Sequence, residues 1–126
     1  MELIIALTIL SIITTVAVSS YTSYVRKGRR IDAVNMLLSI SLAQEKYRGS
    51  NSSYGTLAQV WSGVSTSPEG YYTVAISNVG ASSYTLTATA QGDQANDAVN
   101  GTSCTTLALA MSNGTVTKTP SVCWPT

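Results

Sequence analysis

The apolar run at the start of the chain constrains its fold more than any other feature. Positions 3–18 hold 16 residues without a charge, and a single carboxylate, Glu2, precedes them. A helix that spans a membrane needs about 20 apolar residues. Tyr21 and Tyr24 can extend this run into the interface, where tyrosine is favoured. The run therefore predicts a membrane-spanning helix that carries the polar, Ser/Thr-rich remainder as a head.

The composition of the head limits its chemistry. The chain has 126 residues, enough for one domain with one core, and no histidine. It therefore lacks the commonest general base and a common metal ligand, and no enzymatic activity is predicted. Cys104 and Cys123 suit neither a zinc knuckle nor a CxxC redox pair. We expect a disulfide, which would close a loop of about 20 residues and contribute about 3 kcal/mol; two reduced thiols are the alternative.

The orientation signals conflict. A cleaved signal peptide would need basic residues before the apolar run, whereas Arg26, Lys27, Arg29 and Arg30 follow it. By the positive-inside rule this cluster would be cytoplasmic. A disulfide instead indicates an oxidising compartment. We give the cysteines and the polar head more weight, so an uncleaved anchor with the head outside the cytoplasm is expected.

The helical pattern continues beyond the apolar run. Between positions 25 and 48, apolar residues recur at steps of three and four, as an amphipathic helix requires. Gly49 and the polar residues after it favour a stop. A continuous helix of nearly 50 residues would be about 70 Å long. The residues predicted to pack against the rest of the chain are Ile31, Val34, Leu38 and Leu42, with Leu37, Ile40, Ala43 and Tyr47 widening the stripe.

Four short strands are predicted after a loop over residues 50–68, in which Leu57, Val60 and Trp61 form an apolar anchor of about one helical turn. Alternating patterns cover 71–77, 84–90, 105–111 and 115–119. Asn113-Gly114 indicates a tight hairpin, since both residues tolerate a positive φ. One face of this antiparallel sheet can cover the helix. The predicted fold is α+β, with residues 1–24 as the membrane half of the helix, 25–49 as its amphipathic half and 50–126 as the β head; 25–126 fold as one domain.

The segment between the second and third predicted strands is polar. Its oxygen-bearing side chains could be read as calcium ligands, but their spacing does not fit an EF-hand. We interpret residues 91–103 as a connecting loop, and predict no metal site, cofactor or small-molecule substrate. The side chains in question are Asp93, Asn96, Asp97 and Asn100.

The sequence resembles type IV pilins, and PilE-like minor pilins in particular. The N-terminal likeness lies in Met1-Glu-Leu-Ile-Ile-Ala-Leu and in the stretch from Tyr21 to Ala33. In the head it lies in Tyr84-Thr-Leu-Thr-Ala, Gln94-Ala-Asn-Asp97, Cys104, Leu107-Ala-Leu109, Gly114, Lys118 and Cys123-Trp124. The resemblance implies a pilin held in the inner membrane with a periplasmic head, processed and methylated by a prepilin peptidase, and then packed with other pilins in an extracellular pilus.

The resemblance also implies a role for Glu2, which matches the acid that in pilins attracts the N-terminal amine of a neighbouring subunit. An acid in an apolar surround is costly unless paired; a solvated acid favoured by the helix dipole is the alternative. The residues that the resemblance places in the membrane, and later in the filament core, are Leu3, Ile4, Ile5, Leu7, Ile9, Leu10, Ile12, Ile13, Val16 and Val18.

The chain departs from the pilin pattern in three places. Ser11 and Ser19 stand where many pilins have Gly and Pro. The loop between Asp97 and Cys104 is longer, and the peptidase site that the resemblance implies is expected upstream of Met1.

Two other functions stay open beside that of a minor pilin in filament assembly. One is a type II secretion pseudopilin, against which the cysteine pair argues. The other is a DNA-uptake pilin, although Lys118 is the one basic residue beyond position 49 and nucleic-acid binding needs basic groups. We therefore expect nucleic acid not to be a partner.

Overall fold

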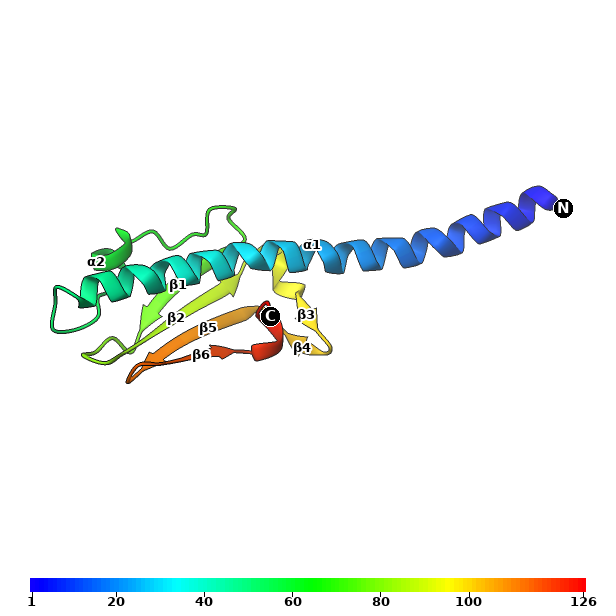
Figure 1. Cartoon of the computed structure of the whole chain (residues 1–126). Helices are drawn as coiled ribbons and strands as arrows, with labels where there is room; N and C mark the ends of the chain where they lie inside the picture. Colours follow the sequence, from blue (N-terminus) through cyan, green and yellow to red (C-terminus); the bar gives the residue numbers. More distant parts are fainter.

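A computed structural model describes residues 1–126, and a single helix runs along its whole length (Figure 1). Helix α1 spans Glu2–Arg48, so at 1.5 Å per residue it is about 70 Å long. Its N-terminal half projects free of the head, and its C-terminal half lies on the sheet. The predicted continuous helix is therefore confirmed, with no break at Gly28 or at the serines of its first half.

Helix α1 ends where one side chain and one backbone N–H donate to the carbonyl groups of its last turn. The Asn51 amide donates to the Tyr47 carbonyl oxygen over 2.8 Å, and the backbone N–H of Gly49 donates to Glu45. The short helix α2, Leu57–Trp61, follows; the Gln59 side chain accepts the backbone N–H of Thr56 at its start. This is the apolar anchor expected from the sequence.

The head is built on one four-stranded antiparallel sheet in the order β1-β2-β5-β6. Its strands are β1 Tyr72–Ser77, β2 Ser83–Ala90, β5 Thr106–Ser112 and β6 Thr115–Thr119. Each lies within one residue of its predicted bounds. The β5–β6 turn has positive φ at Asn113 (49°) and Gly114 (82°), as the Asn-Gly pair predicts. The fold is thus α+β, as expected.

The connection between β2 and β5 is more structured than the predicted loop. It holds the 3₁₀ turn η1, Gly92–Asn96, and a small hairpin of β3 Ala98–Val99 and β4 Thr102–Ser103. Asn100 and Gly101, with φ of 49° and 79°, form the tip of this hairpin. A second 3₁₀ turn, η2 Ser121–Cys123, follows β6.

The core lies between α1 and the inner face of the sheet. The sheet contributes alternate residues of β1, β2 and β5, including the fully buried Tyr72, Tyr84 and Leu86. Five apolar side chains of α1 meet them, together with Arg30 and Gln44. The five are Ala33, Val34, Met36, Leu37 and Ile40.

The predicted packing stripe of α1 is wrong in three of its four positions. Val34 is buried, but Ile31, Leu38 and Leu42 are 49%, 43% and 73% exposed. The face against the sheet is centred near Leu37, about 100° around the helix from Leu38. Both faces are apolar, so the pattern alone did not reveal which one the sheet covers.

Candidate assembly surface and the contacts that orient it

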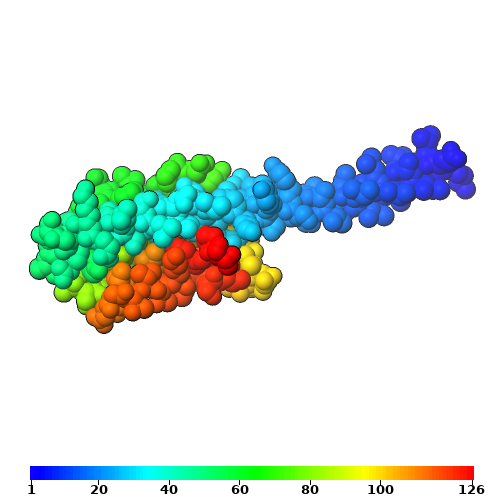
Figure 2. All heavy atoms as spheres, viewed as in Figure 1, coloured from blue at the N-terminus to red at the C-terminus, as the bar shows by residue number.

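The N-terminal half of α1, residues 2–24, packs against nothing within the chain; we call this half the rod. Its large apolar side chains are all at least 53% exposed, and Figure 2 shows them on a rod that stands clear of the head. By length and composition, α1 is the one helix that could cross a membrane. The residues placed there by sequence (Leu3 to Val18) all lie on this rod.

The rod carries hydroxyl groups, but its backbone already satisfies them. Thr8, Ser11, Thr14, Thr15, Ser19 and Thr22 each donate to a carbonyl oxygen three or four residues earlier. Such a helix exposes few unsatisfied polar groups, which is the condition for entering lipid or an apolar bundle.

Glu2 is the one charged residue of this rod. It lies in the first turn of α1, where the helix dipole favours a carboxylate, and it forms no ion pair within the chain.

A second exposed apolar surface continues from the rod onto the head. Ile31, Leu38 and Leu42, spaced seven and four apart, share the face of α1 that points away from the sheet. We call these three residues the α1 ridge. The ridge and the rod form one apolar strip along nearly the whole helix.

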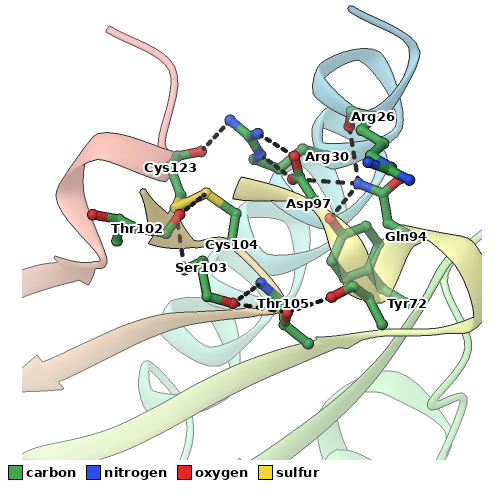
Figure 3. Close-up of polar contacts among 11 residues, drawn as sticks. Arg26, Arg30, Tyr72, Gln94, Asp97, Thr102, Ser103, Cys104, Thr105 and Cys123 are labelled. Atoms are coloured by element: carbon green, nitrogen blue, oxygen red, sulfur yellow. Dashed lines mark hydrogen bonds and ion pairs between the residues drawn. A yellow bond between two sulfur atoms is a disulfide. The ribbon is translucent and has the colours of Figure 1, made fainter. Parts of the chain in front are cut away.

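A buried ion pair fixes α1 to the head at the base of the rod (Figure 3). Arg30 donates from Nε and Nη2 to the two carboxylate oxygens of Asp97, both over 2.7 Å, and from Nη1 to the Cys123 carbonyl oxygen over 3.3 Å. The side chains of Arg30 and Asp97 are only 7% and 3% exposed. This bidentate geometry fixes the orientation of the helix more strictly than apolar contacts do.

Gln94 adds a second polar tie beside this pair. Its amide donates to the Arg26 carbonyl oxygen over 2.9 Å and to the Tyr72 hydroxyl oxygen over 3.0 Å. Burial raises the pKa of Tyr72 above its ordinary value, and the Gln94 contact opposes that rise. Together Arg30 and Gln94 tie η1 and the following residue, Asp97, to one turn of α1.

The basic cluster after the rod is largely paired. Arg26 contacts Asp93 over 3.1 Å and Arg29 approaches the same carboxylate at 4.0 Å. The Arg26 guanidinium holds the pKa of Asp93 below its ordinary value, mainly through the hydrogen bond. Arg29 also lies 4.5 Å from the Tyr71 ring centroid. Both aspartates once considered for calcium are therefore occupied by arginines, and Lys27 alone of the cluster lacks an acidic partner.

The predicted disulfide is present between Cys104 and Cys123, whose Cα atoms are 5.6 Å apart. It joins the residues before β5 to η2, as expected from the sequence. Beside it, Trp124 is buried and the Lys118 ammonium lies 5.2 Å from its ring centroid. The bridge thus anchors the C-terminal segment to which Arg30 also bonds.

A long helix laid on a four-stranded antiparallel sheet, with a C-terminal disulfide loop, defines the type IV pilin class of fold. The sequence matches the family described as "Type IV minor pilin ComP, DNA uptake sequence receptor" over residues 19–108. This chain belongs to that family and is a type IV minor pilin. No curated protein matches it. Pilins are structural subunits, so the family implies contact with other pilins in a pilus.

Proposed function

We propose that residues 1–24 hold this minor pilin in the inner membrane, with its head in the periplasm, and then pack among the helices of other pilins in an extracellular pilus. The observation that carries the proposal is the bare apolar rod, since each large apolar side chain on it is at least 53% exposed. Such a surface needs an apolar environment. Lipid supplies it before assembly, and neighbouring helices supply it afterwards.

Processing by a prepilin peptidase and methylation of the mature amine precede assembly in this proposal. The support is the likeness of the N-terminal sequence to pilins. Residues 25–126 then act as one folding unit, because the core and the Arg30–Asp97 pair join the C-terminal half of α1 to the head. The disulfide closes the head itself.

Glu2 sets the position of the incoming subunit by pairing with the N-terminal amine of a neighbour. A carboxylate surrounded by apolar helices costs several kcal/mol unless a cation meets it. The α1 ridge extends the packing surface beyond the rod. Its exposure is explained if a neighbouring subunit covers it.

The test is to replace Glu2 at its native locus and compare protein in sheared filaments with protein in the membrane. Glu2→Gln and Glu2→Ala are expected to insert normally but to fall at least about tenfold in filaments, which corresponds to about 1.4 kcal/mol. Glu2→Asp, which keeps the charge, is the control and is expected to lose less. Equal filament abundance for wild type and Glu2→Gln would contradict the pairing.

A DNA-receptor role is the second candidate, favoured by the description of the matched family. The geometry offers it few free cations, because Asp93 and Asp97 engage Arg26, Arg29 and Arg30. Lys27, Lys46 and Lys118 are exposed and form no ion pair. A DNA surface on this head would depend mainly on these three lysines.

This candidate is tested with the full chain in neutral detergent and duplex DNA at several salt concentrations. Removing one phosphate contact reduces the salt slope by about 0.9. Replacing Lys27, Lys46 and Lys118 together by Gln is therefore expected to weaken binding and lower the slope. Replacing the same three residues by Arg, which keeps the charges, is the control. No binding by wild type at low salt would rule out this role for the isolated subunit.

A further inference from the structure

A groove of about 780 Å³ runs beside the C-terminal half of α1. One wall is α1 from Val25 to Ser39. The other is the segment from Trp61, the last residue of α2, to Tyr71. Figure 1 shows this segment passing along α1 on its way to β1. At 1.5 Å per residue the helical wall is about 21 Å long. We call this hollow the α1 groove; its length suits a rod better than a compact ligand.

A row of short side chains runs along the helical wall of the groove, which the longer Arg29, Ile31 and Met36 also line. Gly28, Asp32, Asn35 and Ser39 follow one another at steps of four, three and four, which places them on one face of α1. Ile31 of the α1 ridge borders this row. Opposite stand larger groups, mainly apolar: Trp61, Val64, Pro68 and Tyr71. A row of short side chains beside a ridge is a surface into which another helix can pack.

Nothing within the chain requires a glycine at position 28. A Cβ built there meets no atom within 4 Å, and the residue is in regular helix. Glycine in a helix interior costs about 1 kcal/mol relative to alanine. Between apolar helices, however, small residues allow the backbones to approach closely. An approaching helix explains why the groove has a glycine where the isolated subunit gains nothing from it.

The groove also contains an acceptor that lacks a donor. The buried Oδ2 of Asp32 has no hydrogen-bond partner, whereas its Oδ1 accepts the backbone N–H of Glu69 over 3.3 Å. A partner that lies in the groove and carries a donor would satisfy this oxygen.

We propose that the α1 groove receives the apolar N-terminal helix of another pilin subunit. The proposal rests on the filament role above and adds a binding site on the head for the helix of a neighbouring subunit. Val25, the first residue beyond the rod, already lines the groove, so the surface continues the apolar strip without a gap. A pilus brings many apolar rods together, and each needs partners along its length. The groove provides one about 21 Å long.

The first experiment places a photocrosslinking phenylalanine analogue at Asn35 in the full chain, expressed in cells that assemble pili. Asn35 is exposed in the subunit and lies on the helical wall of the groove. Mass spectrometry of sheared filaments is expected to find it joined to the N-terminal helix of a pilin. The same probe at Thr117, on the opposite face of the sheet, is the control. Crosslinks from position 35 to a pilin head, to DNA or to no protein would overturn the proposal.

The second experiment compares two substitutions of Gly28, one expected to stabilise the head and one expected to block assembly. Gly28→Ala adds a Cβ that clashes with nothing in the subunit and is expected to raise the thermal midpoint of the head by a few degrees. Gly28→Leu fills the groove, and its abundance in filaments relative to the membrane pool is expected to fall at least about tenfold. Lys46→Leu, exposed on the same helix but outside the groove, is the matched control.

The outcomes separate this proposal from the filament role. If Gly28→Leu enters filaments as wild type does, the groove proposal fails while the presence of wild type in filaments still supports the minor pilin role. If neither wild type nor Lys46→Leu enters filaments, the filament role fails and this proposal fails with it. Loss confined to Gly28→Leu, with folding intact, supports the groove.

Discussion

Substitution of Asp97 by asparagine gives the sharpest test of how the head holds α1. The change keeps the shape of the side chain but removes the charge that two guanidinium nitrogens of Arg30 meet at 2.7 Å. With both side chains at most 7% exposed, the arginine is left buried without a counter-charge. Breaking a buried pair on one side costs about 3–5 kcal/mol. We expect about 3 kcal/mol, because the Cys123 carbonyl oxygen still accepts from Arg30.

The loss is large against a typical domain stability of about 5–15 kcal/mol. Urea titration measures it, with tryptophan fluorescence as the signal, because Trp61 and Trp124 both lie in the head and the rod has none. With a slope of about 1 kcal/mol per molar urea, the midpoint is expected to fall by roughly 3 M. Asp93→Asn, which removes an exposed acid from the neighbouring pair, is the control and should leave the midpoint unchanged.

A double variant separates the charge from the contact. Arg30→Met combined with Asp97→Leu replaces the pair by apolar groups, and such replacements are often neutral or stabilising. We therefore expect it to recover most of the stability that Asp97→Asn loses. A loss below about 1 kcal/mol for Asp97→Asn would refute the reasoning, as would a double variant no more stable than the single one.

Three further outcomes are expected from the same fluorescence assay. Reduction of Cys104–Cys123 should lower stability by about 3 kcal/mol, since the bridge joins residues 19 apart; an unchanged urea midpoint would count against a structural bridge. Burial raises the pKa of Tyr72 and of Tyr84, so the native state holds these protons more tightly than the unfolded one. Their contribution to stability is complete below about pH 10 and is lost as the pH rises through the raised pKa values. The free energy of unfolding should therefore decline in an alkaline titration. Gly55→Ala should destabilise the head, because its Cβ would lie 2.7 Å from Cγ1 of Val60; a midpoint equal to wild type would show that the neighbours yield freely.

Local patterns in the sequence were sufficient for the elements of the fold. The alternation in 71–77 and 84–90 placed β1 and β2 within a residue, because a strand with one face on a core must alternate. Asn113-Gly114 placed the last hairpin for a local reason as well. The same Asn-Gly signal is present at Asn100-Gly101, at the tip of the β3–β4 hairpin. From it, a hairpin could have been predicted within the segment 91–103.

Contacts between distant residues were not readable in the same way. Arg30 meets Asp97 and Arg26 meets Asp93, each across 67 positions, and no spacing rule links such pairs. The basic cluster that follows the apolar run in the sequence is consequently a set of mostly paired arginines. The α1 groove likewise exists only because the segment from Trp61 to Tyr71 returns alongside the helix.

The apolar run at the start of the chain was determined by sequence alone: sixteen uncharged residues behind Glu2 specify a helix that needs an apolar environment. The sequence also showed that the second half of α1 is apolar on more than one face. Only the tertiary structure decided which face the sheet covers. It turned Leu37 and Ile40 inward and left the α1 ridge outside, because the contacts of Arg30 with Asp97 and with the Cys123 carbonyl oxygen fix the rotation of the helix on the head.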